Sequence, residues 1–457
     1  MTLQERIADL GRALGPRFVT ASAERDQHGG SESHFPLTPP DAVVYPESTA
    51  EVAEIVRACA ARGVPVIGWG AGTSLEGHTT AIRGGVAMDF ARMNRVLSVS
   101  AEDMDCTVQP GLTRTGLNEA LKATGLMFPV DPGADATLGG MAATRASGTT
   151  AVRYGTMRAQ VLGLEVVLAS GEVIRTGSRA RKSASGYDLT GLFVGSEGTL
   201  GLITELTLRL HGQPEAISAA ACAFPSDEAA IDTVIQCIQY GLAPARIEYM
   251  DAESVAAVNA RDGLGLREAP HLLVEFHGTE AGVAEEAARF GEIAAEGGAE
   301  GFRWSSLPEE RARLWKMRHG AYWAIVASRP GCRAIVTDLC VPISRLAEAI
   351  AETRADIAAS GLPGPLVGHV GDGNVHAALL VDPDAPEERA RAAALAERMA
   401  ERALRLGGTV TGEHGVGLGK LKHMEAEHGA AWAVMGAIKA ALDPAGLLNP
   451  GKLVPPR

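Results

Sequence analysis

The chain is poor in aromatic residues and has no long apolar run. Its 457 residues include 5 Trp, 6 Tyr and 9 Phe, so few rings are available to cage a ligand. No window of ~18 uncharged apolar residues is present, which argues against a membrane-spanning helix. Residues 1–15 lack an apolar core behind positive charges, so we expect no secretory signal and predict a short amphipathic helix there.

Closely spaced cysteines are also absent. The sequence has no Cys-x-x-Cys pair, so we expect neither a structural zinc site nor an iron–sulfur cluster bound by this chain alone. Scattered cysteines are typical of reduced, buried thiols in a reducing compartment, and the cytoplasm is therefore the expected location. The six are Cys59, Cys106, Cys222, Cys237, Cys332 and Cys340.

Positive charge is in deficit. Lys and Arg total 42 against 55 Asp and Glu, a formal net charge of −13. Such a chain repels phosphate backbones, so nucleic-acid binding is not expected. It also has no polybasic segment for an anionic lipid surface.

Glycine, in contrast, is abundant, with 54 residues. The length corresponds to roughly two to three domains, and we predict an α+β protein with a boundary at Gln213-Pro214. The region up to there alternates short apolar strands with glycine-rich turns. The region after it has long helices, among them one over 308–327, and strands that include 334–341; we predict a sheet covered on one face. The expected parts are a helix and lead-in (1–35), a mixed α/β domain (36–212), an α+β domain (213–410) and a C-terminal segment (411–457).

Three glycine-rich stretches lie in the first large domain, at 68–79, 130–148 and 194–205. In the first, small residues follow a strand, so successive N–H groups can form a nest for an anion such as a pyrophosphate. Its glycine spacing fits neither the dinucleotide-binding G-x-G-x-x-G pattern nor a Walker loop. A tight structural turn is the alternative for one such stretch, but a long cofactor explains three of them better.

Together with Asn449-Pro450-Gly451-Lys452, these stretches carry a family resemblance. Gly-Ala-Gly-Thr-Ser-Leu-Glu-Gly from residue 70, Thr-Leu-Gly-Gly-Met from 137 and Gly-Ser-Glu-Gly-Thr-Leu-Gly from 195 are similar to motifs of the FAD-linked oxidases of the vanillyl-alcohol oxidase / p-cresol methylhydroxylase fold. The branch indicated is that of the flavin-dependent, cytochrome-type D-lactate dehydrogenases. The resemblance runs from about residue 36 to the C-terminus. It implies a two-part FAD-binding domain, built from the N-terminal region and the C-terminal tail, with an α+β substrate (cap) domain.

The resemblance also assigns FAD-binding positions. Some relatives attach FAD covalently through a His in the first loop; Ser74 stands where that His would be, so non-covalent FAD is expected. The loop at 68–79 would hold the pyrophosphate, the second stretch the flavin and ribityl side, the third the adenine, and the tail would return towards the isoalloxazine. The implied residues are Gly68, Gly70, Ala71, Gly72, Thr73, Ser74, Gly77, His78, Pro132, Gly133, Thr137, Gly139, Gly140, Ser147, Gly148, Glu197, Gly201, Ile203 and Asn449.

A histidine and carboxylate set lies near the C-terminus. Gly-Asp-Gly-Asn at 371–374 predicts a turn, and if Val370 pairs with Val375, His369 and His376 become cross-strand neighbours with Cβ atoms ~5 Å apart. In an extended 411–417 segment, Glu413 would face the pair and His414 the opposite way. Two His and one carboxylate suit Zn, Mn or Fe(II). The alternative is a structural turn with solvated histidines, but relatives place a divalent metal on the matching residues.

Arg318 and Tyr322 are four residues apart and would share one helical face. By composition alone Arg318 is one surface arginine among several. The family's matching Trp-x-x-Arg motif implies instead that Arg318 binds the carboxylate of the substrate, a task that its planar fork suits.

The expected activity is metal-assisted oxidation of a small D-2-hydroxy acid, with His414 as the base and hydride transfer to flavin N5. D-lactate is favoured because the 336–342 strand resembles the lactate branch and lacks the Lys that the glutarate branch carries there; glycolate and D-2-hydroxyglutarate are the alternatives. Electrons would pass to cytochrome c, a quinone or an electron-transfer flavoprotein, which could hold the protein peripherally at an inner membrane. A homodimer is compatible with this assignment. Two other classes stay open: a flavin electron-transfer subunit without its own substrate, and a scaffold without flavin.

Overall fold

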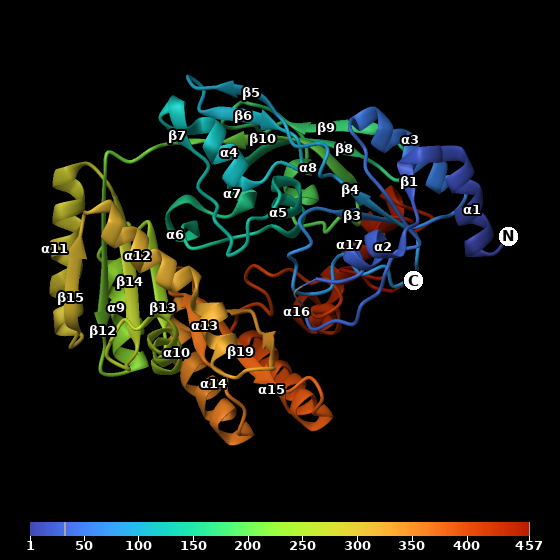
Figure 1. The fold of residues 1–457 in the computed structure, drawn as a ribbon. Helices are drawn as coiled ribbons and strands as arrows, with labels where there is room; N and C mark the ends of the chain where they lie inside the picture. Colours follow the sequence, from blue (N-terminus) through green and yellow to red (C-terminus); the bar gives the residue numbers. More distant parts are fainter. Residues whose placement is uncertain (32, 457) are drawn as a thin grey trace. The chain divides into compact units, whose positions relative to one another are not determined.

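The computed structural model describes residues 1–31 and 33–456 (Figure 1). Two compact units emerge. The first comprises Met1–Ser147, Gly155–Gln213 and Glu413–Arg457, and the second comprises Gly148–Tyr154 and Pro214–Gly412. The N-terminal lead-in therefore belongs to the same unit as the glycine-rich region, and residues 148–154 leave that unit for the second one. Among the described residues, no helix is long and apolar enough to cross a membrane.

The first unit contains two main sheets. A four-stranded sheet has the order β1-β2-β4-β3, with parallel pairing of β2, β4 and β3. A five-stranded antiparallel sheet has the order β5-β6-β10-β8-β9. Their strands are β1 (Phe18–Val19), β2 (Ala42–Val44), β3 (Val66–Trp69), β4 (Val86–Asp89), β5 (Val96–Ser100), β6 (Asp105–Val108), β8 (Val161–Val167), β9 (Val173–Gly177) and β10 (Leu202–Arg209); β7 (Leu126–Met127) pairs with β11 (His211–Gly212).

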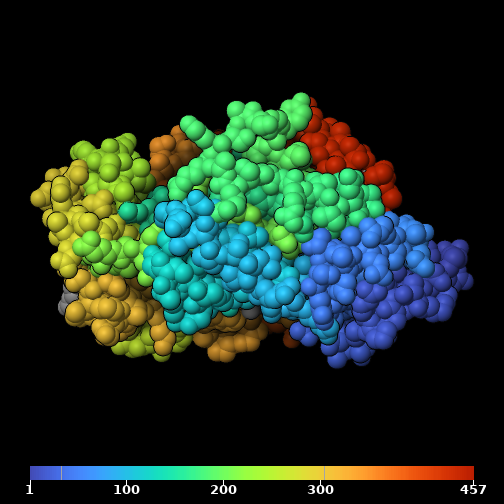
Figure 2. All heavy atoms as spheres, turned by 90° about the horizontal axis from the view of Figure 1, so that it is seen from above, coloured from blue at the N-terminus to red at the C-terminus, as the bar shows by residue number. Residues whose placement is uncertain are grey.

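Helices surround these sheets, and two of them show how the sequence sets their positions. Helix α1 (Leu3–Leu14) buries Ile7, Leu10 and Leu14. The N-terminal part of the chain forms part of the surface seen in Figure 2 (dark blue). Helix α3 (Thr49–Ala60) begins where predicted, because Ser48 Oγ accepts a hydrogen bond from the N–H of Glu51 at 3.3 Å. The others are α2 (Ser22–Gln27), α4 (Arg114–Leu121), α5 (Leu138–Thr144), α7 (Met157–Gln160), α8 (Leu189–Phe193), α16 (Met424–His428) and α17 (Ala430–Leu442).

The C-terminal tail returns to the first sheet, as the resemblance implied. Val66 of β3 donates its N–H to the carbonyl of Leu447 at 2.9 Å, and Asn449 donates its N–H to the carbonyl of Val66 at 2.9 Å. These bonds extend the sheet edge with a segment almost 400 residues away in sequence. They bring Asn449 beside the loop that follows β3.

The second unit is built on one antiparallel sheet of order β15-β12-β14-β13-β18-β19-β16, with β17 also paired to β19. Its strands are β12 (Ala216–Ala223), β13 (Arg246–Met250), β14 (His271–Gly278), β15 (Glu300–Ser305), β16 (Arg333–Val336), β17 (Leu339–Cys340), β18 (Leu366–His369) and β19 (Asn374–Val381). Its helices are α6 (Ala151–Tyr154), α9 (Asp227–Gln239), α10 (Ala252–Asp262), α11 (Glu280–Glu296), α12 (Pro308–His319), α13 (Ala321–Ala327), α14 (Leu346–Ser360) and α15 (Pro386–Arg405).

The prediction of a sheet covered on one face is wrong. One apolar cluster joins α9, α11, α14 and α15 to the sheet, and a second joins α10, α12 and α13 to it. Strands β14 and β19 are accordingly buried almost throughout, as expected of strands with both faces covered. Polar side chains in the middle of this sheet are therefore buried rather than solvated.

Candidate functional site

The loop after β3 has the properties of an anion nest. Within the described chain, the backbone N–H groups of residues 70–75 donate no hydrogen bond, although each of these residues is at least partly exposed. Gly72 has a φ of +70°, and a Cβ on Gly70 would overlap Thr137 Oγ1. Small side chains and unused N–H groups fit the diphosphate of a dinucleotide.

A substitution at Gly70 tests this cradle. We expect Gly70→Ala to weaken FAD binding by roughly 10- to 100-fold, because overpacking costs about 1–3 kcal/mol. The measurement is fluorescence titration of apoprotein with FAD. Gly212→Ala is the matched control, since an added Cβ there meets no atom within 4 Å. An unchanged FAD Kd for Gly70→Ala would contradict this role.

Helix α5 begins next to this loop. Its N-cap residue Thr137 is buried, and its Oγ1 has no hydrogen-bond partner among the described residues. Gly139 packs against Pro110 and donates its N–H to the Pro110 carbonyl at 2.8 Å, whereas Gly133 has open space where a Cβ would be. Thr137 is thus a buried polar group suited to a cofactor, while Gly139 has a packing role. Ser147 and Gly148 are the last two FAD-binding positions predicted in this stretch. Ser147 is the last residue of a segment of the first unit, and Gly148 is the first residue of a segment of the second unit.

Glu197 is engaged by the protein. Its buried carboxylate accepts hydrogen bonds from the N–H groups of Val416 at 2.7 Å and Gly417 at 2.9 Å, and lies 3.2 Å from Nε2 of His78. Burial raises the pKa of Glu197, but His78 and the two N–H donors outweigh it, so this pKa is lowered. Glu197 therefore holds the glycine-rich segment after His414. Of the other two positions of this stretch, Gly201 packs against Val166 and Phe193, and Ile203 is buried in β10.

Asn449 joins the C-terminal tail to these residues. Its side chain donates to the carbonyls of His78 at 3.0 Å and Glu197 at 2.7 Å, and accepts from Nζ of Lys452 at 2.6 Å. Lys452 also donates to the carbonyl of Thr80 at 2.7 Å. Burial lowers the pKa of Lys452 to about 7, and Glu197 offsets only part of this. Sequence reasoning assigned no role to Lys452, although it stands in the Asn-Pro-Gly-Lys motif.

In the second unit, His369 and His376 lie side by side, but through a different register from the one predicted. His369 pairs with Asn374, and His376 pairs with Val367. The turn is a 3₁₀ segment, Val370–Asp372, followed by Gly373 at φ +77°, so Val370 is unavailable for pairing with Val375. The two histidines are diagonal neighbours on one sheet face, and their ring centroids are 5.5 Å apart.

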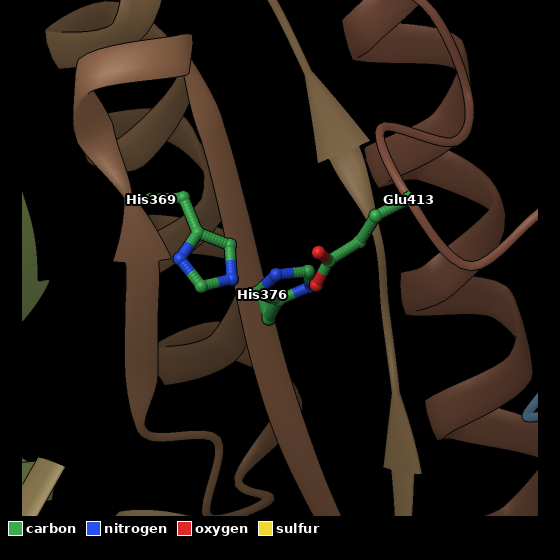
Figure 3. A group of neighbouring side chains, drawn as sticks. All are labelled: His369, His376 and Glu413. Carbon is green, nitrogen blue, oxygen red and sulfur yellow. The ribbon is translucent and has the colours of Figure 1, made fainter. Parts of the chain in front are cut away.

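Glu413 completes the group. One ligand atom from each of His369, His376 and Glu413 lies within 4.8 Å of the others, and their side chains point towards one another (Figure 3). Glu413 is bonded to Gly412, the last residue of the second unit. The chain just before it is fixed on β17, because Thr409 pairs with Cys340 and Thr411 Oγ1 donates to Asp338 Oδ2 at 2.6 Å.

Each histidine is oriented through its Nδ1 atom. His369 Nδ1 lies 2.8 Å from Oε1 of Glu248, and His376 Nδ1 lies 3.0 Å from the carbonyl of Thr337. Metal-binding histidines commonly hold such a partner at one ring nitrogen, which fixes the tautomer for coordination by the other. The donor set and its outer partners fit a divalent metal. Sequence reasoning missed both partners.

Arg318 is buried and paired with a strand carboxylate. It is 8% exposed, and its Nη2 lies 2.6 Å from Oε2 of Glu248. Trp315, one turn earlier on α12, donates to Oε2 of Glu275 at 2.5 Å. The Trp-x-x-Arg motif thus anchors α12 to two buried carboxylates on neighbouring strands. The surface-arginine interpretation is wrong.

Two local expectations about this region are also wrong. The predicted 308–327 helix is divided at Gly320, whose ψ of −4° departs from helical geometry. Tyr322 therefore belongs to the next helix and does not share a continuous helical face with Arg318. The predicted 334–341 strand is interrupted at Thr337 and Asp338, and both of these residues are buried.

The segment carrying His414 is bent rather than extended. Residues 412–414 form a bend, and His414 Nε2 lies 4.0 Å from Oε1 of Glu413. His414 therefore lies next to the group formed by His369, His376 and Glu413.

Comparisons with known proteins agree with this architecture. Residues 40–177 match the FAD binding domain model, and residues 213–453 match the model for the C-terminal domain of FAD linked oxidases. The chain is 50% identical to a probable mitochondrial D-lactate dehydrogenase of Danio rerio over 98% of its length and 92% of the relative's. It is 45% identical to the mitochondrial D-lactate dehydrogenase [cytochrome] of Arabidopsis thaliana, over 99% and 80% respectively.

A solved structure extends the comparison to the fold. p-Cresol methylhydroxylase with substrate bound aligns with a TM-score of 0.78 at 18% identity, over 98% of this chain and 96% of the other. The predicted fold is thereby confirmed. With its FAD binding domain, its oxidase C-terminal domain and these relatives, the chain belongs to the family of FAD-linked oxidases.

Proposed function

We propose that this protein oxidises D-lactate to pyruvate with non-covalently bound FAD and a divalent metal. One observation carries the proposal: Arg318 and His369 are held by the same buried carboxylate of Glu248. Glu248 thus holds two groups together: a guanidinium that can bind a carboxylate, and a candidate metal ligand. This pair suits a substrate with adjacent carboxylate and hydroxyl groups. The D-lactate dehydrogenase names of the two relatives support the same substrate.

Each residue has a defined task in this proposal. Arg318 binds the substrate carboxylate through its remaining N–H donors. His369, His376 and Glu413 hold Zn, Mn or Fe, which supplies a Lewis acid for the α-hydroxyl. His414 takes the hydroxyl proton. FAD, when bound, supplies the acceptor for the hydrogen on Cα and its two electrons. Tyr322 remains a proposed neighbour of the substrate.

Acceptor, assembly and location belong to the proposal as well. Electrons leave to a separate acceptor, with cytochrome c, a quinone and an electron-transfer flavoprotein as the candidates, and a homodimer is the proposed assembly. Free cysteines at all six positions support a reducing compartment such as the cytoplasm, with contact to an inner membrane through the acceptor. The mitochondrial names of the relatives make fractionation of the native host a direct check.

Anaerobic flavin bleaching tests the function. We expect every bleaching acid to carry the carboxylate and hydroxyl that Arg318 and the metal group would hold. Among these acids we expect D-lactate to bleach the flavin absorbance faster than L-lactate, glycolate or D-2-hydroxyglutarate, in line with the names of the relatives. Bleaching by another acid instead would reassign the substrate. A flavoprotein that no 2-hydroxy acid bleaches would favour an electron-transfer subunit, and a colourless protein would favour a scaffold without flavin.

A further inference from the structure

Glu248 is a charged residue at the centre of a buried sheet. It lies in β13 between β14 and β18, and it is 0% exposed. A carboxylate loses its hydration there, which is costly unless partners compensate it. Its presence therefore requires a specific set of contacts.

The two oxygens of Glu248 contact two different groups of the proposed site. Oε1 lies 2.8 Å from Nδ1 of His369, and Oε2 lies 2.6 Å from Nη2 of Arg318. A carboxylate is rigid and planar, so displacement of one oxygen displaces the other. Glu248 thereby ties the orientation of the imidazole to that of the guanidinium.

Neutralising Arg318 alone does not account for this arrangement. A counter-charge requires one ion pair, whereas Glu248 also holds an imidazole on the adjacent strand. Glu275 on β14 offers a comparison within the same sheet: it is buried and contacts α12 through Trp315, and its other oxygen binds His277 at 2.8 Å. Glu275 contacts neither His369 nor Arg318, so it anchors the helix without linking the two groups.

We propose that Glu248 is a positioning residue that sets the metal-binding geometry of His369 and the carboxylate-binding geometry of Arg318 together. The inference rests on the proposed function, because it assigns a metal to His369 and a substrate carboxylate to Arg318. Nδ1 of His369 donates its proton to Glu248, which leaves Nε2 as the ligand atom. Loss of the carboxylate therefore weakens metal binding and substrate binding at once.

Metal affinity provides a readout that is separate from turnover. Zinc Kd is measured on purified holoprotein by competition with a chromophoric chelator, for wild type, Glu248→Gln and the matched control Glu275→Gln. We expect Glu248→Gln to raise the zinc Kd by about 10- to 100-fold and to raise the KM for D-lactate, while Glu275→Gln leaves the zinc Kd within about twofold. Glu248→Asp keeps the charge but has a shorter side chain, so we expect a zinc Kd between those of wild type and Glu248→Gln. This variant replaces Glu248→Gln in the test if the Gln variant does not fold.

The outcomes separate the inference from the proposed function. A wild-type protein that binds none of zinc, manganese and iron, or whose flavin D-lactate does not bleach, removes the function on which the inference rests. If wild type does both, unchanged zinc affinity in Glu248→Gln and Glu248→Asp overturns the positioning role. An equal loss of zinc affinity in Glu275→Gln also overturns the positioning role. In that case any buried carboxylate of this sheet would affect zinc binding, through the general stability of the fold.

Discussion

Arg318→Ala is expected to lower kcat/KM for D-lactate by about 10²- to 10⁴-fold. Two charge-assisted hydrogen bonds to the substrate carboxylate contribute about 1.5–3 kcal/mol each, and alanine supplies neither. Steady-state kinetics with an artificial acceptor measure the change. The same variant leaves the buried Glu248 without its cation, which costs about 3–5 kcal/mol of folding stability.

Two further variants separate binding from folding. Arg318→Lys keeps the positive charge but loses the planar fork, so we expect a folded protein with a raised KM. The double variant Arg318→Met with Glu248→Gln removes both charges, and we expect it to recover thermal stability without recovering activity. A normal KM in either Arg318→Lys or Arg318→Ala would remove Arg318 from the substrate site.

The sequence predicted the parts of the site that depend on local patterns. Glycine runs after strands are a local signal, and the loop at 70–75 has the unused N–H groups that this signal implies. His369 and His376 flank a turn, so any short hairpin brings them near each other. Their register could not be predicted, because it depends on how many residues the turn uses, and the 3₁₀ segment uses three.

The partners of these residues could not be predicted, because they come from distant strands. Glu248 stands in Arg-Ile-Glu-Tyr-Met, where alternating charge and apolar character is typical of a strand with one solvated face. Helices α10, α12 and α13 cover that face instead, and the charge becomes a buried anchor. The role of Thr337 could not be predicted for a similar reason. The sequence predicted a continuous strand there, but the strand breaks at Thr337, and the Thr337 carbonyl lies 3.0 Å from Nδ1 of His376.

Removal of the metal is expected to abolish most of the activity reversibly. A Lewis acid at the α-hydroxyl contributes several kcal/mol to the transition state, so protein freed of metal with a chelator should lose about 10²- to 10⁴-fold in kcat/KM. Zn or Mn should restore the rate. His376→Gln should lose the same activity without recovery, because one of three ligands is gone.

His271→Gln is the matched control for this experiment. His271 is a buried histidine on β14 of the same sheet, and its Nδ1 contacts the carbonyl of Ala269 at 2.8 Å, outside the metal-binding group. We expect this variant to retain its metal and its activity, so a loss confined to His376→Gln would locate the metal at the predicted group. Full activity in protein verified as metal-free would instead show that the group is structural, and proton transfer to His414 would then proceed without a Lewis acid on the substrate hydroxyl.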